Sequence, residues 1–161
     1  MKPLKHHTLK EYIHQLSAKT PVPGGGSAAA LTGALGVALI SMAANYSCGK
    51  NSLETIEKNI KEILGKSEKI KNCLLKLVDL DAQAYRDVVK ARKASPVIKS
   101  KALNKARAVS LEVAEQCYQA IKLTPYLVQR GNLNLIADVQ IAIELLLAAY
   151  HSAMVNVEFN Q

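Results

Sequence analysis

Residues 20–49 carry no charged side chain, and this segment constrains the fold more than any other feature of the chain. From Ser27 to about Cys48 the pattern predicts a helix that is apolar on all sides and roughly 33 Å long. A helix of that length could cross a bilayer. However, Ala and Gly outnumber Leu and Ile, and polar residues such as Ser41 and Asn45 are scattered through it. The pattern therefore favours the central buried helix of a bundle over a membrane span.

Three consecutive glycines, Gly24, Gly25 and Gly26, precede the expected helix start at Ser27. Free amides at a helix N-terminus attract anions, and glycines let a ligand approach the backbone closely. The segment is neither a Walker loop nor a Rossmann fingerprint. It is either part of a ligand site or a tight turn packed against another helix. Small residues inside the helix, around Ala30 to Gly36, would likewise let a neighbouring backbone approach.

The rest of the chain predicts further helices separated by prolines and glycines. Thr8 and Glu11 form a capping-box pattern at the start of a short helix over about 9–18. The other expected helices cover about 53–94, 98–130 with a kink or break at Pro125, and 135–153, and VNVEFN is expected to be a short extended tail. With no repeat or linker, residues 1–161 predict one all-α domain, an up-and-down bundle of about five helices.

The formal net charge of +8 favours an anionic partner. Seven basic and no acidic residues lie between Asp87 and Glu112, which is either a solvated helix junction or an attractive surface for a polyanionic ligand. Nucleic acid is disfavoured because no recognition motif or interleaved aromatic side chains are present. Three widely spaced cysteines and no metal-ligand spacing predict no disulfide framework and no metal, in a cytoplasmic protein.

Two aspartates occupy positions where helical spacing places apolar side chains. Asp81 falls in the stripe of Leu77, Val78 and Tyr85, and Asp138 shares its face with Leu135 and other apolar residues. Carboxylates removed from water tend to have raised pKa values, which suits a general acid or base. Alternatively, each binds a backbone amide or pairs with a buried Lys or Arg.

Five segments in order resemble the cyclodeaminase/cyclohydrolase family, which includes the C-terminal half of formiminotransferase-cyclodeaminase and bacterial methenyltetrahydrofolate cyclohydrolases. They cover essentially the whole chain. In two of them the family's pattern is altered: Ser110 replaces a proline, and Ala137 replaces the serine before Asp138. The five segments are TPVPGGGSAAALTGALGVALISMAAN, LVDLDAQAY, VSLEVAEQC, GNLNLIADV and NVEFN.

The resemblance implies an all-α homodimer that acts on tetrahydrofolate one-carbon derivatives without another cofactor. Asp81 stands at the family's catalytic carboxylate. The implied substrate-binding residues are Gly24, Gly25, Gly26, Ser27, Asn132 and Asp138. The expected activity is that of a formimidoyltetrahydrofolate cyclodeaminase. A methenyltetrahydrofolate cyclohydrolase and a non-catalytic folate-binding module remain alternatives, and the basic residues would attract a folate tail, which is sometimes polyglutamylated.

Overall fold

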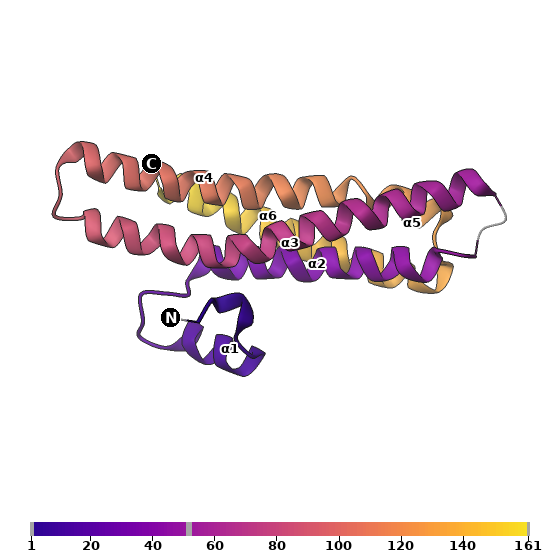
Figure 1. Ribbon diagram of the computed structural model, residues 1–161, viewed down its shortest axis with the longest axis horizontal. Helices are drawn as coiled ribbons and strands as arrows, with labels where there is room; N and C mark the ends of the chain where they lie inside the picture. Colours follow the sequence, from indigo (N-terminus) through magenta and orange to yellow (C-terminus); the bar gives the residue numbers. More distant parts are fainter. Residues whose placement is uncertain (1, 51–52, 161) are drawn as a thin grey trace.

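Four long helices make up the body of the protein in this computed structural model, which describes residues 2–50 and 53–160 (Figure 1). No strand occurs in those two ranges, so the expected all-α class is confirmed. The long helices are α2 (Gly25–Ser47), α3 (Glu54–Ala91), α4 (Pro96–Ile121) and α6 (Ile136–Phe159). The short elements are η1 (Leu4–His6), α1 (Leu9–Ser17), α5 (Thr124–Arg130) and η2 (Leu133–Leu135).

The long helices run alternately up and down. Helix α2 packs against α3 and α6, and α4 packs against the same two helices. Helices α3 and α6 therefore lie diagonally opposite each other, with α2 and α4 between them. The α3–α4 hairpin projects beyond the ends of α2 and α6 (Figure 1).

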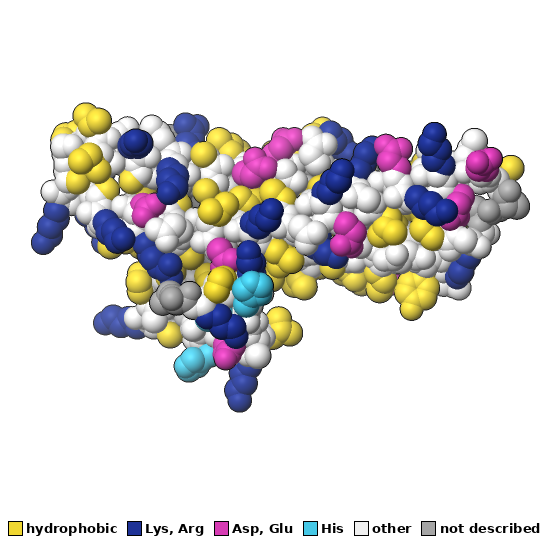
Figure 2. Space-filling model, in the orientation of Figure 1, with side chains coloured by type: hydrophobic (Ala, Val, Ile, Leu, Met, Phe, Trp, Pro, Cys, Tyr) yellow, Lys and Arg dark blue, Asp and Glu magenta, His cyan; other side chains and the backbone are white. Residues whose placement is uncertain are grey.

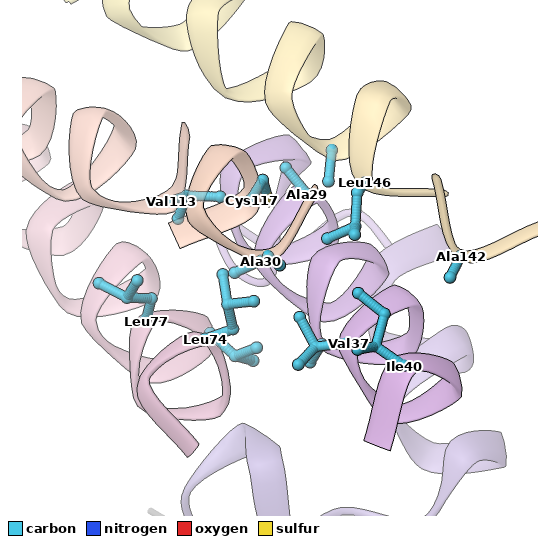
Figure 3. Close-up of a cluster of buried hydrophobic side chains, with 14 of the residues drawn as sticks. Ala29, Ala30, Val37, Ile40, Leu74, Leu77, Val113, Cys117, Ala142 and Leu146 are labelled. Carbon is cyan, nitrogen blue, oxygen red and sulfur yellow. The ribbon is translucent and has the colours of Figure 1, made fainter. Parts of the chain in front are cut away.

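Helix α2 is the uncharged segment, and it is the most buried helix of the bundle. Its small residues let neighbouring helices approach closely, as expected from the sequence. A Cβ atom built on Gly36 would lie 2.9 Å from Leu146 Cγ and 3.0 Å from the Ala142 carbonyl oxygen of α6. Ala30, Val37 and Ile40 of α2 fill the core beside these contacts (Figure 3).

Prolines and a glycine mark three of the helix ends: the end of α2 and the starts of α4 and α5. Residues 54–91 form one continuous helix, and Pro96 opens the next one. The break expected near Pro125 occurs between Ile121 and Thr124. Gly49, after the end of α2, adopts φ +73°, a conformation that side chains disfavour. The sequence also predicts that Ser52 caps the helix after Gly49, and this position lies outside the described residues.

The prediction of an extended C-terminal tail is wrong, because α6 continues to Phe159. The alternating valines of VNVEFN suggested a strand, but no Pro or Gly interrupts the helix there. Val157 is buried against the bundle, and tertiary packing overrides the local β preference. This extension places the asparagines of the tail on a helix rather than in a flexible segment.

The N-terminal arm, residues 2–18, lies beside the bundle rather than within it (Figure 1). The expected capping box is present, with Thr8 and Glu11 bonded to each other's backbone amides. Asp79 holds the arm to α3: its carboxylate accepts a 2.6 Å hydrogen bond from the Leu4 amide and pairs with Lys5 at 3.6 Å. By helical spacing Asp79 shares a face with Lys76, Gln83 and Arg86, which predicts a solvated position, but in the structure it is part-buried against the arm.

Two helical segments are long and apolar enough, by length and composition alone, to cross a membrane: α2 and residues 133–159. They differ in burial, since 61% of the most apolar window of α2 is buried against 22% for the second segment. The burial of α2 is that of a core helix. Packing within one chain does not explain the exposed apolar surface of α6.

We predict that Gly36→Ala lowers the free energy of unfolding by about 1–3 kcal/mol, because the new methyl group would press on the α6 backbone. Gly65→Ala is the matched control, since Gly65 lies exposed in α3 with no atom within 4 Å of an added Cβ. Alanine there should stabilise the protein by roughly 0.5–1 kcal/mol. Urea denaturation measures both, and equal effects would contradict the close approach of α2 and α6.

Candidate active site

A cavity of about 380 Å³ opens at the end of the bundle where α2 begins and α6 ends. Its volume falls within the range of small-molecule sites. The walls come from the loop before α2, from α3, from α4 and from the last turns of α6. The lining residues are Thr20, Pro21, Val22, Pro23, Gly24, Gly25, Gly26, Asp81, Tyr85, Ala106, Asn156, Phe159 and Asn160.

The three glycines form the first turn of α2 and the residue before it. The helix begins at Gly25, two residues earlier than expected, with Gly24 as its N-cap. A Cβ atom on Gly26 would overlap Asp81 Oδ1 and lie 2.6 Å from its Cγ. A side chain at this position would therefore displace the Asp81 carboxyl group, because that group rests directly on the helix backbone.

Asp81 is part-buried on α3 and faces the start of α2. Burial raises the pKa of its carboxyl group, and a hydrogen bond from the backbone N–H of Ser27 opposes this by favouring the charged form. Burial is the larger effect, so the pKa is raised overall. The expectation of a carboxylate held largely out of water is thus confirmed in geometry, and such a group can exchange protons closer to neutral pH.

Tyr12 of the N-terminal arm reaches beneath the glycine turn. Its hydroxyl group lies 3.0 Å from Ser27 Oγ, and both side chains are buried. Burial and the charge of Asp81 raise the pKa of Tyr12, so its phenol stays protonated at neutral pH. Sequence analysis missed Tyr12, because its position in an amphipathic helix gave no sign of a distant hydroxyl partner.

Helix α6 supplies three further cavity residues that sequence analysis did not assign: Asn156, Phe159 and Asn160. The two asparagines are four residues apart, so both lie on one helical face. Neither carboxamide has a hydrogen-bond partner among the described residues. The NVEFN segment contains the two asparagines at a four-residue spacing. Because an extended tail was expected there, this spacing was not interpreted as a helical one.

The remaining predicted site residues lie elsewhere in this chain. Ser27 is fully buried beneath the cavity and contributes its backbone N–H to Asp81. Asn132 caps η2 and donates its backbone N–H to Ser47 Oγ at 2.8 Å, at the other end of α2. Asp138 is in the first turn of α6, about 27 Å along the helix from Asn156. One chain alone does not bring Asn132 or Asp138 to the cavity.

Beyond the cavity, the α3–α4 hairpin carries many of the Lys and Arg side chains, together with exposed apolar ones (Figure 2). A second hollow of about 370 Å³ lies there, with an apolar floor that includes Ala91 and Ile98. Lys105 pairs with Asp87 at 2.8 Å at its edge, while Lys90 and Lys101 also line it. Lys105 lines this hollow, whereas Ala106, the next residue of α4, lines the first cavity.

The arrangement suits proton transfer on a flat organic molecule. One carboxyl group with a raised pKa faces the cavity, which also has aromatic side chains and unpaired carboxamides on its walls. No group of three potential metal ligands occurs within residues 2–50 and 53–160. The fold and cavity thus define an all-α bundle protein with a site for acid/base chemistry on a small molecule.

Comparisons with known proteins are consistent with that class. The family model described as formiminotransferase-cyclodeaminase matches residues 8–161. A methenyltetrahydrofolate cyclohydrolase from Methylorubrum extorquens is 33% identical over 167 residues, covering 96% of this chain and 79% of that protein. The formimidoyltransferase-cyclodeaminase of Rattus norvegicus is 29% identical over 95% of this chain, which spans only 30% of the rat protein.

A solved structure agrees over nearly the whole fold. The crystal structure of formiminotetrahydrofolate cyclodeaminase from Thermotoga maritima matches with a TM-score of 0.94 and 30% sequence identity. The match covers 98% of this chain and 79% of that one. The chain therefore belongs to the formiminotransferase-cyclodeaminase family, a family of enzymes, as its resemblance to that family indicated.

We predict that Asp81→Asn makes the protein more stable at neutral pH. The folded state keeps the Asp81 proton to higher pH than the unfolded state does, because burial raises the pKa of Asp81. Between those two pKa values the folded chain binds more protons, so the free energy of unfolding of the wild type falls as pH rises. The variant has no carboxyl group to ionise at this position and avoids this loss. Its free energy of unfolding should therefore exceed that of the wild type near pH 7.5 and not near pH 4.

Asp79→Asn is the matched control, two residues away on α3. Its carboxylate binds the Leu4 amide and Lys5, so removal of its charge should weaken the protein at neutral pH rather than strengthen it. Urea denaturation of both variants at pH 4 and pH 7.5 measures whether the first is stabilised and the second destabilised at neutral pH. A loss of stability in Asp81→Asn at pH 7.5 would contradict the burial of an ionisable carboxyl group.

Proposed function

We propose that this chain binds a tetrahydrofolate one-carbon derivative in the cavity beside Asp81, and acts as a formimidoyltetrahydrofolate cyclodeaminase. The observation that carries the proposal is the Asp81 carboxyl group, which has a raised pKa and faces a cavity of small-molecule size. The similarity to the Thermotoga maritima cyclodeaminase, at a TM-score of 0.94, supports the same reaction.

In this reaction N10 of the substrate attacks the formimino carbon on N5, and ammonia leaves. Asp81 would take the proton from N10 and deliver it to the departing nitrogen, so one carboxyl group serves as base and then as acid. The new N10–carbon bond and the broken carbon–nitrogen bond leave the methenyl bridge between N5 and N10. The cavity would hold N5 and N10 in position for the intramolecular attack, which supplies proximity catalysis.

A cyclohydrolase is the second candidate, and the 33% identity to the Methylorubrum extorquens enzyme favours it. Here water would attack the methenyl carbon, Asp81 would accept the proton from water, and N5 would leave with a proton to give 10-formyltetrahydrofolate. Both reactions use the same acid/base and the same cavity. The direction of an absorbance change therefore has to distinguish them.

The basic hollow between α3 and α4 is proposed to receive the glutamate tail of the folate. Lys90, Lys101 and Lys105 line it together with Asp87, and Ala106, the residue after Lys105, lines the first cavity. Carboxylates of a tail leaving the cavity would meet these ammonium groups in sequence. Additional glutamates on a polyglutamylated tail would extend the same contacts.

We predict that formiminotetrahydrofolate produces the methenyltetrahydrofolate absorbance band in the presence of the protein. Growth of the band identifies a cyclodeaminase, whereas accelerated loss of the band from added methenyltetrahydrofolate identifies a cyclohydrolase. Asp81→Asn should lower kcat by about 10²–10⁴-fold, because it removes the acid/base. The wild-type rate should fall as pH decreases through the raised pKa of Asp81, since the carboxylate form is needed to accept the proton.

Asp87→Asn is the matched control for this assay, because Asp87 lies on the same helix but pairs with Lys105 outside the first cavity. It should keep the wild-type kcat. Full activity in Asp81→Asn would refute the assigned role of Asp81. Folate binding by the wild type with no turnover of either substrate would instead identify a non-catalytic folate-binding module.

The exposed apolar surface of α6 is proposed to pair with a second copy of the chain. Ile141 and Val155 are 52% and 50% exposed. The same exposed surface carries Gln140, Glu144 and His151, which a lipid environment would disfavour in the middle of a span. A self-complementary contact in water accommodates both kinds of side chain.

An antiparallel pairing of two α6 helices would also explain the remote predicted site residues. Asp138 and Asn156 are equally distant in sequence from Leu147. A two-fold axis at the level of Leu147 would therefore bring Asp138 of one copy to the same level along the paired helices as Asn156 of the other, which lines its cavity. Asn132, which directly precedes η2 and α6, would lie just beyond.

We predict that the protein is a dimer in solution and that Ile141→Glu makes it monomeric, as measured by light scattering. Asp81→Asn and Asp138→Asn subunits, each inactive alone, should regain about one quarter of wild-type activity when mixed and exchanged. Half of the dimers would then be mixed, and each mixed dimer would contain one site with both aspartates and one site with neither. About one quarter of all sites would therefore be intact. No recovery in mixed dimers would contradict a shared site, and a wild-type protein that partitions into membranes would contradict the aqueous dimer.

A further inference from the structure

Two asparagines line the cavity at the end of α6: Asn156 lies in its last turn, and Asn160 is the C-cap residue that follows it. Both residues are part-buried, and neither side chain has a hydrogen-bond partner among the described residues. A carboxamide contains two N–H donors and a carbonyl acceptor, and in the free protein these polar atoms remain accessible to water. Two such side chains lining one cavity can exchange that water for a ligand with matching polar atoms.

The position of the two asparagines in the bundle limits which part of a ligand they can contact. Asp81 and Tyr85 belong to α3, and the asparagines belong to α6, which lies diagonally opposite α3. The start of α2 and Ala106 of α4 form the walls between them. A flat ligand in this cavity would thus have one edge toward the carboxylate and the other toward the carboxamides.

We propose that Asn156 and Asn160 bind the 2-amino-4-oxo edge of the pterin ring, which orients N5 and N10 toward Asp81. This inference rests on the proposed folate function and assigns the part of the site that recognises the ring. The amino-oxo edge offers N–H donors beside a carbonyl acceptor, which a carboxamide can match, as asparagine does with adenine in DNA. The reacting N5 is in the other ring of the bicycle.

Phe159, which lies between the two asparagines in the sequence, adds an aromatic ring to the cavity wall. It is the single phenylalanine of the chain and is 84% exposed at the cavity. A bound pterin would cover this ring and could stack on it, which gives an exposed aromatic side chain a use. The carboxamides then fix the orientation of the ring within its plane.

The proposal predicts a change in KM rather than in kcat. Asn156→Leu and Asn160→Leu should each raise KM, and the Kd for tetrahydrofolate, by about ten-fold, because each removes hydrogen bonds to the ring. At saturating substrate kcat should stay within about three-fold of wild type, since Asp81 is untouched. Asn156→Gln and Asn160→Gln, which restore a carboxamide, should recover part of the lost affinity.

Asn72→Leu is the matched control, because Asn72 is exposed on α3 and does not line the cavity. It should leave both constants unchanged. A KM equal to that of wild type in both leucine variants would overturn the assignment, and so would a parallel collapse of kcat and helical circular dichroism. A wild type that neither binds nor converts folate would refute the proposed function itself, whereas a normal wild type with unaffected leucine variants would refute only this assignment.

Discussion

The contact between the Asp81 carboxyl group and the backbone of Gly26 determines how the whole site is built. Because Gly26 has no side chain, α3 can place a carboxyl group directly on the first turn of α2. That turn offers the Ser27 N–H to the charged form, while burial favours the neutral form. The balance leaves the carboxyl group able to exchange protons in a protected position, which is the property acid/base chemistry requires.

The same principle of close approach explains why small residues gather on one side of α2. A Cβ at Gly26 would meet α3, one at Gly33 would lie 2.8 Å from Cys117 Sγ of α4, and one at Gly36 would meet α6. Three neighbouring helices thus approach the same side of α2 at three successive levels. A charged side chain on that side would be buried, so this packing requires it to be uncharged.

The sequence was sufficient to predict the helices, because apolar residues recur at helical spacing. It was also sufficient to single out Asp81, because an acidic side chain stands there at a position where that spacing expects an apolar one. It was not sufficient for Tyr12 or Asp79, whose partners, Ser27 and Leu4, come from other segments of the chain. The α6 asparagines were missed for a different reason. Val155 and Val157 alternate as in a strand, but the segment is helical and buries only Val157 of the two against the bundle.

In the proposed dimer, α6 has two roles that are physically linked. Its exposed apolar surface would be buried by the second copy, and its last turns carry Asn156 and Asn160 to the cavity. Burial of the helix surface would restrict the motion of those turns, so association would pre-organise the part of the site that holds the ring. By thermodynamic reciprocity, a ligand bound there would strengthen the dimer by the same factor. An apolar helix that remains mostly exposed in one chain therefore makes sense as a shared element of assembly and recognition.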